Sequence, residues 1–157
     1  MRHILQRHWD GCGIAALAMV LDKTYNEVLE IVHPDREPRG SCSTETKEIY
    51  ETLKAQNVKF RITHPNELPL FPSNDAIVYI AWRWRLPWGL YGGHWIVWDH
   101  KRQRYLDPGS CWENRSGHRV YFRTAPTSRQ LNRFRTAFAR GHRTCFMIMA
   151  GRSASCA

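Results

Sequence analysis

The feature that most constrains this sequence is a cysteine near the amino terminus, which stands between two glycines and directly precedes an apolar run. Cys12 lies between Gly11 and Gly13, and Ala, Leu, Met and Val dominate the run up to position 21. This composition is typical of a buried helix, so we expect Cys12 at a helix amino terminus. Free N–H groups and the helix dipole favour the reactive thiolate there, and the glycines would let a ligand backbone approach. The alternative is a small buried cysteine that opens a core helix.

The length of 157 residues predicts one domain, with seven Trp, six Tyr and six Phe to fill its core. We place this domain at residues 1–150 and expect residues 151–157 to be a disordered tail. No window approaches the roughly eighteen apolar residues that cross a bilayer, and the amino terminus lacks the apolar centre and cleavage site of a signal peptide. We therefore expect a cytoplasmic protein that does not enter a membrane.

The cysteines and histidines give no metal or disulfide pattern. The five cysteines are odd in number and widely spaced, and no two of them form a Cys-x-x-Cys pair. None of the eight histidines falls into a His-Glu-x-x-His or comparable spacing. We expect reduced thiols, no structural metal and no cofactor.

The net charge of +9 is concentrated at the carboxyl end, where residues 114–157 contain nine Arg and no acidic residue. This region can be a solvated helix face, a docking surface for an acidic protein partner, or a nucleic-acid surface. Leu131, Phe134 and Phe138 share one helix face, which favours the solvated face. No nucleic-acid-binding motif accompanies the charge, so we do not expect a nucleic-acid partner.

Hydrophobic periodicity predicts a helical amino-terminal third followed by an antiparallel sheet, an α+β layout. Thr24 and Glu27 form a capping box for a second helix, which should stop near His33, before a proline. Ser43 or Thr44 can cap a third helix. Strands are expected at 58–63, 76–82, 92–99, 104–107, 118–123 and 144–150, and a further helix at 127–141.

Three more residues could complete a catalytic site with Cys12. A thiol nucleophile needs a base and an acceptor that orients the base. His94 begins one strand of the expected hairpin and Asp107 ends the other, so their side chains should meet at one end of the sheet. The backbone N–H of Cys12 and the amide of Gln6 can bind a developing oxyanion. Alternatively, His94 is a core histidine and Asp107 part of an ordinary turn.

Four segments carry a resemblance to a known family: Gln6, the Cys12-Gly13 helix start, Gly93-His94-Trp95-Ile96-Val97, and Leu106-Asp107-Pro108. Over about residues 3 to 110 they resemble the papain-like cysteine peptidases that cleave double-glycine leaders from bacteriocin precursors. The resemblance implies a papain-like α+β fold, a peptide or protein substrate and a bacterial or phage setting. It also implies Cys12 as nucleophile, His94 as general base, Asp107 as its orienting acid and Gln6 in the oxyanion hole.

The sequence departs from this family at two points. Asp10 stands one residue before the usual position of an acid next to the cysteine, with Gly11 between them. The membrane spans and ATPase of the exporter-linked members do not fit in this chain, so a transport role is not implied.

Around the site, we expect Gly93, Trp84, Trp88 and Trp95 to contact substrate, with Trp84 and Trp88 walling a peptide cleft.

Two other functions remain open from the sequence. A transglutaminase-like acyl transferase would use the same residue types with an amine in place of water. A non-catalytic papain-like adaptor would instead bind an acidic partner through residues 114–157.

Overall fold

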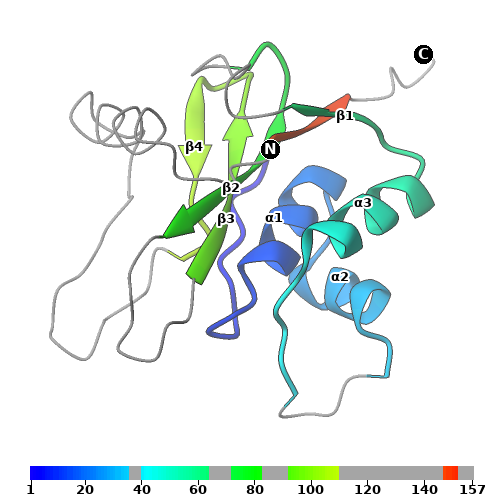
Figure 1. Cartoon of the computed structure of the whole chain (residues 1–157). Helices are drawn as coiled ribbons and strands as arrows, with labels where there is room; N and C mark the ends of the chain where they lie inside the picture. Colours follow the sequence, from blue (N-terminus) through cyan, green and yellow to red (C-terminus); the bar gives the residue numbers. More distant parts are fainter. Residues whose placement is uncertain (36–39, 64–71, 83–91, 110–146, 152–157) are drawn as a thin grey trace, which may run out of the picture.

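The computed structural model describes residues 1–35, 40–63, 72–82, 92–109 and 147–151. Within these ranges the chain forms three helices: α1 (Cys12–Leu21), α2 (Tyr25–Val32) and α3 (Thr46–Ala55). It also forms five strands: β1 (Lys59–Thr63), β2 (Ala76–Trp82), β3 (Gly92–Asp99), β4 (Arg104–Leu106) and β5 (Met147–Gly151). The helices group on one side of the sheet (Figure 1).

The five described strands form one antiparallel sheet in the order β1-β5-β2-β3-β4. Ile80 pairs with His94 across β2 and β3, and Val97 pairs with Leu106 across β3 and β4. Strand β5 lies between β1 and β2, so a late segment of the chain completes the sheet. The expected α+β class, helices with an antiparallel sheet, is confirmed.

Helix α1 is the centre of the hydrophobic core. Its residues from Ile14 to Ala18 are fully buried and cluster with Val28 of α2, Ile49 of α3 and Val97 of β3. A helix that is apolar all round is stable only when neighbours cover every side. This complete burial fixes the start of α1, and with it Cys12, relative to β3.

The sequence predicts the ends of α2 correctly but not the start of α3. Thr24 and Glu27 form the expected capping box, and α2 ends at Val32. The predicted caps of α3, Ser43 and Thr44, are wrong: the N-cap is Glu45, whose backbone N–H donates to Glu48 Oε2 at 2.6 Å. The two residues have other partners, since Ser43 N–H donates to Asp10 and the Thr44 hydroxyl donates to the Cys42 carbonyl.

The predicted hairpin is confirmed as β3 and β4, joined by a turn over residues 100–103. Strand β5 reaches Gly151, which we expected to begin the tail. The predicted strand at 118–123, the helix at 127–141 and residues 152–157 lie outside the described residues. In the part of the chain that is described, no helix combines the length and apolar character needed to cross a membrane.

Candidate active site

Cys12 is the first residue of α1 and is 9% exposed. The N-cap is Gly11, which has no side chain to cap the helix, whereas α2 and α3 both begin with capping boxes. The first N–H groups of a helix have no intrahelical acceptor, and they carry the positive end of the helix dipole. The thiol therefore lies where negative charge on a bound oxyanion is favoured.

His94 and Asp107 are in direct contact, as the hairpin geometry predicts. His94 Nε2 lies 2.7 Å from Asp107 Oδ1, and the two side chains are 16% and 8% exposed. Asp107 Oδ1 also accepts a hydrogen bond from the Gly109 N–H at 2.7 Å. The carboxylate is thus held in place and fixes the orientation of the imidazole.

The pKa of His94 depends on Asp107 and on Cys12. Burial alone would lower the pKa of His94, but hydrogen bonds to Asp107 and to the Cys12 side chain raise it to about 9. The arrangement favours the imidazolium form of His94.

Glycines beside the site leave room for neighbouring side chains. A Cβ on Gly109 would lie 3.0 Å from His94 Cε1, and a Cβ on Gly93 would collide with the Tyr79 hydroxyl. Gly11 and Gly13 have the same role, which corrects the expectation that they admit a ligand. The Tyr25 hydroxyl lies against Gly11, and a Cβ on Gly13 would meet the Thr44 Cβ at 2.6 Å.

The Gln6 amide points into its own loop. Gln6 Nε2 donates to the carbonyls of His8 and Trp9 at 3.0 and 2.9 Å. Among the described residues, no group donates to the buried Gln6 Oε1. The amide therefore shapes the turn that leads into Cys12, and it would have to leave these carbonyls to reach an oxyanion.

Asp10 is the residue whose importance the sequence analysis missed. Its Oδ2 accepts three hydrogen bonds, from the Ser41 hydroxyl and from the backbone N–H groups of Cys42 and Ser43, at 2.6 to 3.1 Å. This carboxylate ties the loop before Cys12 to the loop before α3. Asp10, the acid that stands one residue before the family position, thus holds the backbone at Cys42 and Ser43. Only the tertiary contacts reveal this role.

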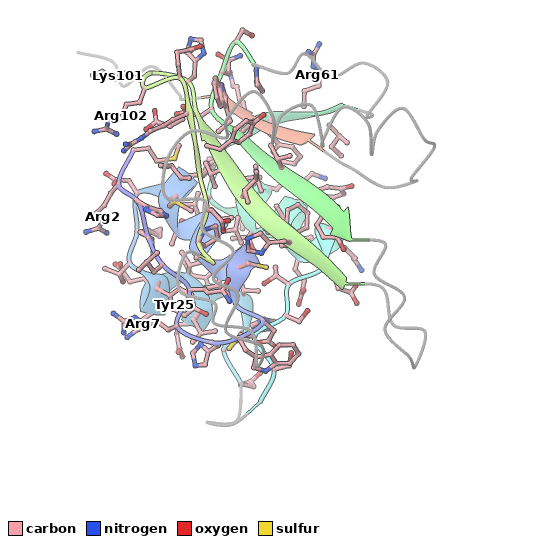
Figure 2. All side chains as sticks on the ribbon, turned by 90° about the vertical axis from the view of Figure 1, so that its left-hand side faces the viewer. Arg2, Arg7, Tyr25, Arg61, Lys101 and Arg102 are labelled. Atoms are coloured by element: carbon pink, nitrogen blue, oxygen red, sulfur yellow. The ribbon has the colours of Figure 1, made fainter. Side chains whose placement is uncertain are left out.

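Tyr25 contacts the same loop through His8. Burial raises the pKa of Tyr25, and the nearby Cys42 raises it further, so the hydroxyl stays protonated. Its oxygen lies 3.0 Å from His8 Nδ1, and the two rings are in contact. Tyr25 and Arg7 lie at the same end of the molecule (Figure 2). The turn before Cys12 is therefore braced on both sides.

Two of the four residues that we expect to contact substrate, Gly93 and Trp95, lie in the described part of the chain. Trp95 is 3% exposed and donates from Nε1 to the Thr44 carbonyl at 3.1 Å. It packs in the core under α1, so its expected contact with substrate is wrong. Gly93 is exposed next to His94. Trp84 and Trp88 lie outside the described residues.

Basic side chains gather along one edge of the described part of the molecule, where Arg2, Arg7, Lys101 and Arg102 lie (Figure 2). The three arginines have partners: Arg2 donates to the Lys23 carbonyl, Arg7 to Asn26 Oδ1, and Arg102 pairs with buried Asp99. They hold the amino-terminal segment against its neighbours. Of the expected acidic-partner surface at residues 114–157, the structure describes only β5 (Met147–Gly151), a segment without arginine.

Comparison of the chain with protein-family models and with curated proteins gives no match. Within the described ranges, no cluster of three or more His, Cys, Asp or Glu side chains could hold a metal ion. The chemistry of the site follows from its own residues: a thiol at a helix amino terminus, and an imidazole that is hydrogen-bonded to a carboxylate.

Proposed function

We propose that this protein is a papain-like cysteine peptidase, an amide-bond hydrolase that acts on a peptide or protein substrate. One observation carries the proposal: His94 Nε2 lies 2.7 Å from Asp107 Oδ1, and the pKa of His94 is raised by Asp107 and by the Cys12 side chain. Nucleophile, base and orienting acid in this order are the recognised arrangement for nucleophilic catalysis. The papain-like fold is part of the proposal and is supported by the Cys12 helix packed against β3.

In the first half of the reaction, the Cys12 thiolate attacks the carbonyl carbon of the substrate amide and forms a C–S bond. The His94 imidazolium then gives its proton to the leaving amine as the C–N bond breaks. In the second half, a water molecule attacks the thioester and gives a proton to His94. The C–S bond breaks, which releases the acid product and restores the thiolate.

The oxyanion of each tetrahedral intermediate needs preorganised donors. The Cys12 N–H at the uncapped start of α1 supplies one of them. The Gln6 amide supplies the second after it turns away from the His8 and Trp9 carbonyls. Because the amide has to rotate first, the second donor depends on bound substrate.

The first test is the reactivity of Cys12 with iodoacetamide, followed by mass spectrometry. We expect Cys12 to be alkylated at pH 6 faster than an ordinary thiol, and His94→Ala to abolish this advantage. His100→Ala is the matched control, because His100 contacts the Pro72 carbonyl instead of the thiol. Equal rates in the wild type and the His94→Ala variant would overturn the proposal.

The second test is the cleavage of a library of synthetic decapeptides. We expect the wild type and Cys42→Ala to cleave peptides and Cys12→Ala to be inactive; Cys42 is a fully buried thiol that serves as the control. Methylamine added to the reaction separates hydrolysis from acyl transfer. Mainly methylamide products would identify a transglutaminase-like enzyme, and cleavage by Cys12→Ala would exclude Cys12 as the nucleophile.

A further inference from the structure

Trp9 is the most exposed large apolar side chain in the described part of the chain, with 75% of the residue exposed. Trp95 and Trp98, by contrast, are 3% and 1% exposed. Tryptophan has the largest apolar surface of any side chain and is normally buried or engaged in binding. The exposure of Trp9 therefore needs an explanation.

The backbone that presents Trp9 is fixed. The preceding carbonyl, of His8, accepts a hydrogen bond from the Gly11 N–H at 3.1 Å, which does not depend on the Gln6 amide. The next residue, Asp10, is held by three donors. A ring presented by such a rigid turn can be covered with little further loss of backbone entropy.

The position of Trp9 limits what can cover it. Trp9 precedes Cys12 by three residues, and three residues span at most about 11 Å. An extended peptide advances about 3.3 Å per residue, so this span corresponds to about three substrate positions. A peptide whose scissile carbonyl lies at the Cys12 sulfur, and which runs from there toward Trp9, would therefore come within reach of the indole.

We propose that Trp9 is a specificity-determining residue that packs against an apolar side chain of the peptide substrate, within three positions of the cleaved bond. The inference rests on the proposed function and names the substrate class: peptides with an apolar residue close to the scissile bond. Contact with one large apolar side chain corresponds to a preference of about 10- to 100-fold in kcat/KM.

The test compares wild type, Trp9→Ser and Trp9→Phe on a library of randomised synthetic decapeptides, with cleavage sites located by mass spectrometry. We expect the wild type to select an apolar residue within three positions of the cleaved bond. Trp9→Ser should lose that preference by about 10- to 100-fold, and Trp9→Phe should keep part of it. Ile62→Ser is the matched control, because Ile62 is an exposed apolar residue of β1, three strands away from β3.

The rate of Cys12 alkylation by iodoacetamide separates the two hypotheses, because this reagent has no side chain to contact Trp9. Normal alkylation together with an unchanged apolar preference in Trp9→Ser would overturn the role of Trp9 and leave the peptidase intact. Slow alkylation of Cys12 and no cleavage in any variant would overturn both. A wild-type dimer that Trp9→Ser dissociates, without a change in cleavage preference, would assign the indole to self-association instead.

Discussion

The ring of His3 donates a hydrogen bond to the backbone of Asp107: His3 Nε2 lies 2.7 Å from the Asp107 carbonyl oxygen. Three residues later, the Gln6 N–H donates to the Pro108 carbonyl at 3.0 Å. The segment that leads to Cys12 is thus fastened to the turn that carries the carboxylate partner of His94. Two parts of the site that are distant in sequence share one support.

We predict that His3→Ala lowers kcat about tenfold with little change in KM, because the backbone of Asp107, and with it the carboxylate that orients His94, would be held less firmly. The free energy of unfolding should fall by only about 1 kcal/mol, the usual worth of one hydrogen bond. Peptide cleavage and urea unfolding measure the two effects. His3→Gln should restore part of kcat, since its amide can also donate. Arg2→Ala, which alters the same segment, should leave kcat unchanged.

The pKa of His94 predicts a pH dependence of stability. Its value in the folded protein is about 9, above the ordinary 6.5, so the folded state holds the proton more tightly. The resulting stabilisation is complete below about pH 6.5 and is lost as the pH rises through about 9; the difference between these pKa values corresponds to about 3 kcal/mol. Urea unfolding of the wild type and His94→Gln should therefore differ most at pH 6.

The matched control for this prediction is Asp107→Asn, which removes a charge that raises the pKa of His94. When His94→Gln is added to Asp107→Asn, the resulting change in stability should vary less with pH than it does in the wild type. If the wild type and His94→Gln differ by the same free energy at pH 6 and pH 10, the imidazolium does not stabilise the folded state.

The parts of the fold that the sequence predicted are those determined by near neighbours in the chain. The capping box of Thr24 and Glu27 satisfies backbone groups within one helical turn. The hairpin that joins β3 to β4 needs only a short polar turn, and its two strands bring His94 to Asp107. Contacts between near neighbours in the sequence therefore made much of the candidate site predictable.

The errors arose where distant residues decide the outcome. Ser43 was a reasonable cap for α3, but its N–H donates to Asp10, which lies far earlier in the chain. Trp95 next to His94 looked available to substrate, but α1 covers it. The place of β5 between β1 and β2 depends on a pairing across most of the chain. No periodicity or spacing in the sequence records these contacts.

Gly13 gives a prediction that contradicts the usual rule for helices. Replacing a helical glycine with alanine normally stabilises a protein by up to about 1 kcal/mol. At Gly13 the new Cβ would lie 2.6 Å from the Thr44 Cβ and 3.1 Å from Trp95 Cδ1. We therefore expect Gly13→Ala to lower the free energy of unfolding by about 1–3 kcal/mol, as measured by urea denaturation. A stabilised variant would show that α1 packs more loosely against Thr44 than these distances require.

Gln6 distinguishes a catalytic role from a structural one. If its amide turns to bind the oxyanion, Gln6→Ala should lower kcat about 10²- to 10³-fold, the usual cost of losing one such donor. If the amide only holds the His8 and Trp9 carbonyls, the variant should lose stability but keep most of its kcat. Single-turnover cleavage and thermal unfolding separate these outcomes.

Gln6→Glu sharpens the comparison, because a carboxylate of the same shape cannot donate to either carbonyl and would repel an oxyanion. We expect Gln6→Glu to be at least as slow as Gln6→Ala; a kcat near that of the wild type would leave the Cys12 N–H as the oxyanion donor without help from Gln6.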